Sequence, residues 1–170
     1  GMVLLGSGIA VGALGLVVVV VMLVATSLEG VAGPFMLQRT PGFDVTGLGL
    51  VTPLADGVEA SWERLVAGQS GAARIVQFDP KDVVTTYACE VKRGDGTDGT
   101  FNADRYMEPK DQRKVDNFII FGLAAAVQAV EDAGIADLTD AEKLRVGVMA
   151  GSGIGGLNSI ANTALLMKEK

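Results

Sequence analysis

Histidine is absent from this chain of 170 residues, and cysteine occurs once, at Cys89. A single cysteine cannot form an internal disulfide, and a chain without histidine lacks the Cys/His clusters that hold structural zinc. Without a histidine to activate it, Cys89 is poorly suited to act as a nucleophile, because the thiolate is the reactive form. We therefore interpret Cys89 as a structural thiol, and we expect no metal site.

Positive charge is also scarce. The chain has 14 Lys and Arg against 20 Asp and Glu, which gives a formal net charge of -6. Nucleic acids bind surfaces rich in Lys and Arg, so this balance argues against a nucleic-acid partner for the chain as a whole. A local basic patch remains compatible with it, and the segment 110–114 supplies three cations.

Charge of either sign is missing from residues 1–28, and residues 8–28 form an almost unbroken apolar run. A helix of that length would span a bilayer. The run is nevertheless rich in glycine and β-branched residues, and no Lys or Arg precedes it to set an orientation or to start a secretory signal. Three interpretations stay open: a membrane anchor, foreign sequence joined to the rest, or a buried strand built on residues 17–21.

The composition changes near residue 44, so we divide the chain into an apolar segment with its linker, 1–44, and a second domain, 45–170. Pro41 and Gly42 are poor residues for the interior of a strand. We therefore expect any strand that enters the second domain to be short, and to lead into a glycine turn at residues 45–53.

Hydrophobic periodicity in the second domain predicts both helices and strands. A short amphipathic helix should follow Asp56, which would cap it. A long helix should run from Pro109 to the residue before Gly134 and be buried from Phe118 onward. Strands are expected at 74–78, 85–91 and 145–150, and a closing helix from about residue 157. Strand, buried helix and strand in alternation indicate an α/β layered core.

Four motifs follow one another along the second domain. They are V-T-G-L-G-L-V-T-P at 45–53, W-E-R-L-V-A-G-Q-S-G at 62–71, M-E-P-K-D-Q-R-K-V-D at 107–116 and G-S-G-I-G-G at 151–156. In this order they resemble the beta-ketoacyl-acyl-carrier-protein synthase II family of condensing enzymes. The resemblance covers about residues 45–170 and implies a thiolase-like fold, in which alternating layers of helices and sheets are made from two similar halves. This chain would supply only part of the first half.

The resemblance implies an acyltransferase of fatty-acid elongation. Members of the family condense malonyl-carrier protein with an acyl thioester, using an activated cysteine and two histidines. In the family these residues lie beyond the position that matches Lys170, so we expect no catalytic residue in this chain and no condensation by the chain alone. With neighbouring strands missing, we also expect uncovered apolar surface and aggregation.

Assembly and location follow from the same resemblance. Members of the family are usually homodimers, they act in the cytoplasm, and they need no metal or organic cofactor of their own. Membrane association of this chain would follow only if residues 1–28 are native.

Two functional positions are implied residue by residue. Ile154 matches the position that lines and gates the acyl pocket, although the same residue would also serve as a plain core isoleucine. Lys110, Arg113 and Lys114 match the basic patch that docks the acidic acyl carrier protein. Cations at a helix start oppose the helix dipole, which favours a functional role over a merely solvated surface.

Two other functions are weighed. Gly151, Gly153 and Gly156 satisfy the pattern G-x-G-x-x-G, which is typical of a dinucleotide site when a strand precedes it and a helix follows. That fingerprint also expects an acidic residue about twenty positions on, and the sequence given ends first, at Lys170. The other alternative is a non-catalytic, membrane-tethered module that binds acyl carrier protein through the patch around Lys110.

Overall fold

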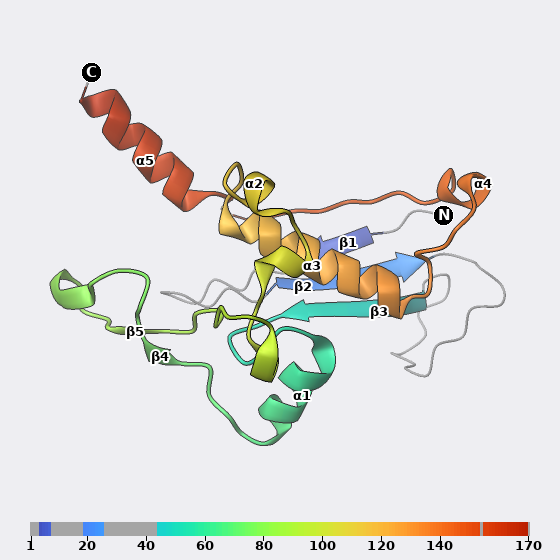
Figure 1. Cartoon of the computed structure of the whole chain (residues 1–170), viewed down its shortest axis with the longest axis horizontal. Helices are drawn as coiled ribbons and strands as arrows, with labels where there is room; N and C mark the ends of the chain where they lie inside the picture. The colour runs from blue at the N-terminus through green and yellow to red at the C-terminus, as the bar shows by residue number, and fades with distance from the viewer. Residues whose placement is uncertain (1–3, 8–18, 26–43, 154, 170) are drawn as a thin grey trace.

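The fold is taken from a computed structural model of the chain, which describes residues 4–7, 19–25, 44–153 and 155–169 (Figure 1). A three-stranded sheet carries one long helix, and shorter helices and loops extend from this pair. The greater part of the apolar run and the linker at 26–43 lies outside the described residues.

The three strands of the sheet are antiparallel and lie in the order β1-β2-β3. They are β1 (Leu4–Ser7), β2 (Val19–Ala25) and β3 (Asp44–Val51). Val21 lies opposite Gly49 in the register of β2 and β3. Valine, which is branched at Cβ, favours extended backbone, and the valine-rich residues 19–25 form a strand. Within the described ranges, no helix is long and apolar enough to cross a membrane.

The strand β3 corrects one expectation, because the first motif forms a strand and not a glycine turn. Gly47 and Gly49 lie against the helix α3 (Asn117–Asp132). A Cβ atom at position 49 would collide with the carbonyl of Ala125, and one at position 47 with that of Ala129. The two glycines therefore let the backbone of the helix lie directly on the strand.

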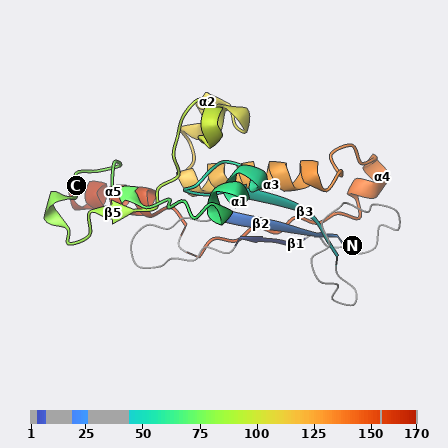
Figure 2. The ribbon, with the colours of Figure 1, turned by 90° about the horizontal axis from the view of Figure 1, so that it is seen from below.

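The helix α3 covers one face of the sheet, as Figure 2 shows from a second direction. Its apolar sequence predicts burial, and the structure confirms it for one face only, since Ile119 and Leu123 are 41% and 37% exposed. The core consists of Val51, Phe101, Ile120, Phe121, Ala124, Ala125, Ala129 and Ala133. At the helix surface, Asp132 Oδ2 accepts from the Leu48 N–H at 2.8 Å and Gln128 Oε1 from the Leu50 N–H at 2.9 Å. Side chains of α3 thus satisfy two backbone donors of β3.

The helix α1 (Val58–Val66) lies where the sequence predicts it, but Asp56 does not cap it. Gly57 occupies the N-cap position, and no side chain bonds to the start of the helix. The helix buries Ser61, whose hydroxyl lies 3.0 Å from that of Thr52, and leaves Trp62 61% exposed. Its apolar face therefore points to solvent.

The long helix expected from Pro109 is interrupted. Pro109 does open a helix, α2 (Pro109–Gln112), in the first turn where proline is favoured. The backbone becomes extended again at Asp116 (φ -75°, ψ 155°) before α3 begins. Val115 packs against the core at this break. The chain turns here, which partly buries this valine and leaves Lys114 before it exposed.

The strands expected outside the sheet are short or missing. β4 (Ala73–Arg74) pairs with β5 (Tyr87–Ala88), and each has only two residues. The prediction of a buried strand at 145–150 is wrong: these residues form no strand, and Val148 is 73% exposed. A strand needs a neighbour to pair its backbone groups, and no described strand pairs with this segment. Mixed helix and strand content is confirmed, but the strand after α3 is not.

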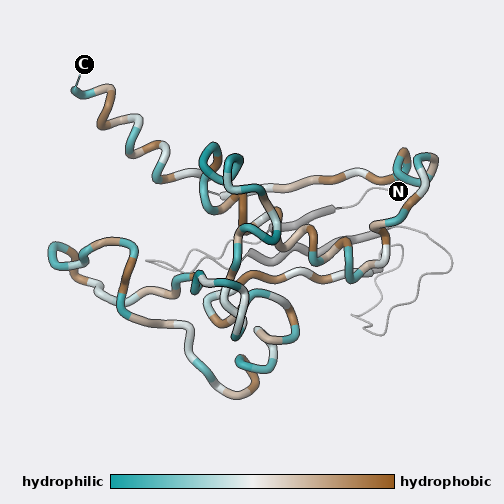
Figure 3. Tube along the Cα trace, viewed as in Figure 1, coloured by the Kyte–Doolittle hydropathy of each residue, from teal (hydrophilic) through white to brown (hydrophobic). Residues whose placement is uncertain are grey.

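The remaining elements are single turns and a terminal helix. They are η1 (Pro80–Asp82), η2 (Thr97–Gly99), η3 (Ala103–Arg105), α4 (Asp140–Lys143) and α5 (Leu157–Lys168). The closing helix begins at Leu157 as predicted. It extends away from the sheet, and Figure 3 shows hydrophobic residues along it and along the segment before it.

Candidate functional site

The basic patch, defined as Lys110, Arg113 and Lys114, lies on α2 and the turn after it. All three residues are exposed. Lys110 Nζ lies 2.9 Å from Glu108 Oε2, and Lys114 Nζ lies 2.7 Å from Asp111 Oδ1. Arg113 forms no ion pair within the described part of the chain. The structure therefore brings all three cations predicted from the sequence onto one turn.

The ion pairs within the patch are weak because they are exposed. Pairs of this kind contribute only about 0–1 kcal/mol to stability, since water screens both charges. An acidic partner can displace Glu108 and Asp111 from the lysines at a correspondingly small cost in free energy. Among the described residues, Arg113 has no carboxylate that such a partner would need to displace. The patch is chemically suited to binding an anionic surface.

Gln112, the last residue of α2, connects this helix to η3, and sequence reasoning missed it. Its Nε2 donates to Asp104 Oδ1 and to the Met107 carbonyl, each at 2.7 Å. Asp104 belongs to η3, which is itself capped by Asn102 through a 3.0 Å bond from the Asp104 N–H. The one indication in the sequence was that Gln112 is a neutral amide inside a run of charged residues. The partners of Gln112 could not be identified without the structure.

A half-buried polar cluster of Asp56, Tyr106 and Gln128 lies behind η3. Tyr106 Oη donates to Asp56 Oδ2 at 3.0 Å, while Gln128 Nε2 donates to Asp56 Oδ1 at 2.8 Å and to Tyr106 Oη at 3.1 Å. Burial raises the pKa of Asp56 above its ordinary 3.8, although the two hydrogen bonds oppose the rise. Burial also raises the pKa of Tyr106. The cluster joins the entry to α1, η3 and α3.

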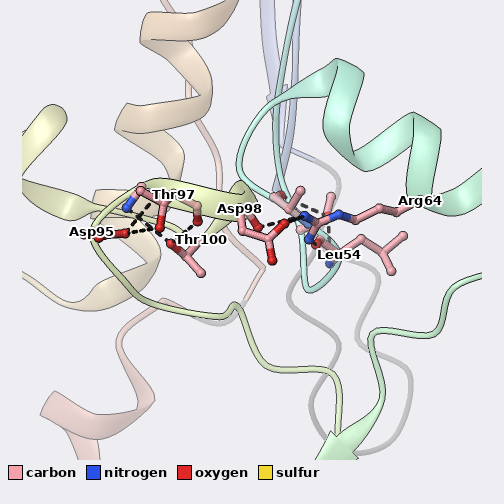
Figure 4. A network of polar contacts seen from close by, with 9 residues as sticks. Leu54, Arg64, Asp95, Thr97, Asp98 and Thr100 are labelled. Atoms are coloured by element: carbon pink, nitrogen blue, oxygen red, sulfur yellow. Dashed lines mark hydrogen bonds and ion pairs between the residues drawn. The ribbon is translucent and has the colours of Figure 1, made fainter.

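Arg64 of α1 holds the loop that carries η2, as Figure 4 shows. Its guanidinium donates to the Leu54 carbonyl at 2.6 Å and to the carbonyl and Oδ1 of Asp98 at 2.7 and 2.9 Å. Within the loop, the hydroxyl and N–H of Thr97 donate to Asp95 Oδ1, which lowers the pKa of that carboxyl. These bonds fix the loop.

In the described residues, no His, Cys, Asp or Glu side chains gather in a group able to hold a metal.

In the glycine segment, Gly151, Ser152 and Gly153 are exposed, whereas Gly155 and Gly156 are partly buried. Ile154, the candidate acyl-pocket residue, lies outside the described residues. Gly155 has a positive φ of 75°, and its N–H donates to Ser152 Oγ at 3.1 Å. The helix α5 follows, but residues 144–153 contain no strand. The strand that a dinucleotide fingerprint requires is therefore not found in the described chain before this segment.

The start of α5 lies beside the residues that follow the basic patch. Ser159 Oγ donates to Asp116 Oδ1 at 2.9 Å. A Cβ atom on Gly156 would collide with the same carboxyl group. The end of the fourth motif, at Gly156, thus approaches the end of the third motif, at Asp116.

Comparisons with known proteins give one consistent result. Residues 44–170 match the family model of the beta-ketoacyl synthase N-terminal domain. The chain is similar to 3-oxoacyl-[acyl-carrier-protein] synthase 2 of Rhizobium meliloti (strain 1021), with 46% identity over 126 residues, which cover 74% of this chain and 30% of that protein. The enzyme of the same name from Vibrio cholerae serotype O1 (strain ATCC 39315 / El Tor Inaba N16961) is 42% identical over 126 residues, with 74% and 28% covered.

Among solved structures, the ishigamide ketosynthase/chain length factor matches 57% of this chain and 22% of that chain, with 32% identity and a TM-score of 0.46. The chain spans about 30% of the length of these two curated relatives.

Proposed function

The chain belongs to the beta-ketoacyl synthase family, and from this membership we infer that it is the amino-terminal part of a fatty-acid condensing enzyme. The proposed reaction of the whole enzyme begins with transfer of an acyl group from carrier protein to an enzyme thiolate. Malonyl-carrier protein then loses CO2, and the resulting carbanion attacks the acyl thioester. The carbon–carbon bond forms as the enzyme thiolate leaves.

In this proposal the present residues bind and do not carry out the chemistry. The reaction needs an activated thiolate, and the sequence contains no histidine and only Cys89. Cys89 directly follows β5 and is partly buried, as is usual for a structural thiol. We expect the chain alone to form no condensation product.

The observation that carries the proposal is the gathering of Lys110, Arg113 and Lys114 on one exposed turn of an otherwise acidic chain. The proposed partner is acyl carrier protein, which the family resemblance describes as acidic. Complementary charge steers two proteins into the correct encounter and discriminates against wrong partners. A patch of three cations against a net charge of -6 provides that local complementarity.

Further features of the intact enzyme are part of the same proposal. They are a layered thiolase-like fold completed by residues outside this chain, a homodimeric assembly, a cytoplasmic location, and acyl and malonyl thioesters as substrates. Ile154 is proposed to line the acyl pocket. Its substitution by a larger residue should shorten the acyl chains that the complete enzyme accepts, because selectivity there would depend on shape.

Titration of the chain with acyl carrier protein tests the proposed partner. The triple variant Lys110→Glu, Arg113→Glu, Lys114→Glu should bind at least about tenfold more weakly, since each lost contact contributes a few tenths to 1 kcal/mol. The matched control replaces three other exposed lysines, Lys81, Lys92 and Lys143, by glutamate. It has the same net charge and should bind within about twofold of the native chain. Equal weakening of binding in both variants would refute the proposed role of the patch in binding acyl carrier protein.

A non-catalytic module that binds acyl carrier protein is the second candidate, because the exposed basic patch on α2 would serve binding without any catalytic residue. The two candidates differ in what happens after the chain is supplied with the rest of a condensing enzyme. Restored condensation of malonyl-carrier protein would support the partial enzyme. Binding of carrier protein that never leads to condensation would support the module.

A further inference from the structure

The helix α2, which carries the basic patch, is too short to be stable without contacts to the rest of the chain. It has four residues, and its N-cap residue Glu108 makes no side-chain hydrogen bond to the helix start. One turn of helix fixes several backbone angles in return for very few hydrogen bonds, so an isolated turn is unstable in water. Something outside α2 must therefore fix its orientation.

The flanking residues Met107 and Val115 pack against the core, and Gln112 adds two hydrogen bonds from the helix itself. Its side-chain amide donates both of its hydrogens, one to Asp104 Oδ1 and one to the Met107 carbonyl, each at 2.7 Å. The first bond has a charged acceptor, which makes it stronger than a neutral pair. Both bonds connect α2 to η3 and to the residues between the two turns.

Contacts of Tyr106 anchor η3 to the core. Tyr106, which caps η3, donates its hydroxyl to Asp56 at 3.0 Å and accepts from Gln128 at 3.1 Å. Its ring stacks on Phe101, with centroids 5.7 Å apart and an interplanar angle of 10°. A continuous series of contacts therefore runs from α3 through Tyr106 and η3 to Gln112.

We propose that Gln112 is a positioning residue for the basic patch, holding Lys110, Arg113 and Lys114 in the arrangement that an acidic partner protein recognises. This inference rests on the proposed function of the patch. Gln112 has no charge, so it acts through α2 and not by contact with the partner. Loss of its two bonds lets α2 sample other orientations, and the partner must then select the competent one, which lowers the apparent affinity.

Salt dependence separates positioning from direct charge contact. Salt screens interactions between exposed charges, so the salt dependence of binding reports the number of charges that take part. Gln112→Ala leaves that number unchanged, and it should weaken binding with the same dependence on salt. Arg113→Ala removes one charge, and it should weaken binding and also reduce the dependence on salt.

The experiment uses the full chain and purified acyl carrier protein, titrated at several salt concentrations. Gln112→Ala should reduce affinity about threefold to tenfold and speed amide hydrogen exchange at residues 111–114. The matched control Gln69→Ala changes an exposed glutamine elsewhere and should alter neither quantity. If Gln112→Ala unfolds the chain, Gln112→Met keeps the length of the side chain, removes the donors and takes its place.

The outcomes are distinct. Unchanged affinity in the Gln112 variant, with or without faster exchange, overturns the positioning role. A lowered affinity with a reduced salt dependence also overturns it, because a charge contact would then have been lost. If the native chain shows no binding to acyl carrier protein, the proposed function fails first. Faster exchange in the variant would then report only that Gln112 stabilises α2.

Discussion

Single carboxyl groups in this chain are placed in opposite electrostatic surroundings. Asp56 is half-buried among Tyr106 and Gln128, and burial raises its pKa. Asp95 is exposed and accepts two hydrogen bonds from Thr97, at 2.9 and 2.6 Å, which lower its pKa. A raised pKa favours the protonated form in the folded state, and a lowered pKa favours the ionised form. The two groups should therefore affect stability with opposite dependence on pH.

Replacing Asp56 by Asn should benefit the chain most at neutral pH. Because its pKa is raised on folding, ionisation of Asp56 costs stability as the pH rises from about 3.8 through the folded-state pKa. The asparagine variant lacks this loss, while its carbonyl can still accept from Gln128. The difference in unfolding free energy, variant minus native, should therefore be more positive at pH 7 than at pH 3. Urea unfolding at both pH values measures it.

The control for this prediction is Asp95→Asn, which should show the reverse trend. The lowered pKa of Asp95 contributes stability above its unfolded-state pKa, and this contribution disappears as the pH falls through the folded-state value. The variant should have a lower free energy of unfolding than the native chain at pH 7. This difference should disappear at acidic pH. The same sign of change in both variants would contradict the assigned surroundings.

At the scale of elements, the contact between β3 and α3 depends on two positions without a side chain. A Cβ at Gly49 would meet the backbone of Ala125, which cannot move without shifting the helix. Overpacking of this kind destabilises by about 1–3 kcal/mol. Gly49→Ala should lower the free energy of unfolding by at least that amount, as measured by the midpoint of urea unfolding with an unchanged slope.

Gly122→Ala is the matched control. Gly122 lies in α3 itself, and a Cβ there would meet nothing within 4 Å. Replacing glycine by alanine in a helix interior stabilises by about 0.5–1 kcal/mol. Opposite effects of the same substitution at the two glycines would confirm the close approach. A harmless Gly49→Ala would contradict it.

Local pattern predicted some elements of this chain well. The apolar composition from Phe118 to Val130 predicted a buried helix, and Leu157 was identified as the start of the closing helix. Pro109 was correctly placed at a helix start. These features depend on neighbouring residues, which the sequence shows directly.

Other elements depend on partners that are distant in sequence. The first glycine motif resembles a turn by composition, yet it forms β3, and its glycines allow α3 to lie directly on the strand. Residues 145–150 have the composition of a buried strand but have no described neighbour to pair with. The cations of the patch could be named in advance, whereas Gln112 could not, because its partners Asp104 and Met107 are defined only by the fold.

At the scale of the whole molecule, apolar surface is left uncovered in several places. Trp62 on α1 is 61% exposed, and in α5 Leu165 and Leu166 are 61% and 62% exposed. All of α5 is exposed, although seven of its twelve residues are apolar. Exposed apolar surface is typical of interfaces or of aggregation where it forms large patches. The family fold offers a reason for it, since the chain spans about 30% of the length of its curated relatives.

The exposed face of α5 should make the isolated chain associate with itself. The double variant Leu165→Lys, Leu166→Lys should lower both the mean mass seen in light scattering and the fluorescence of a dye that binds apolar surface. The matched control, Asn162→Lys with Thr163→Lys, adds the same charge to the same exposed helix and removes no apolar side chain. If association is driven by burial of apolar area, the control should remain close to the native chain. An equal reduction in the two variants would show that net charge governs association, and that the apolar side chains of α5 do not drive it.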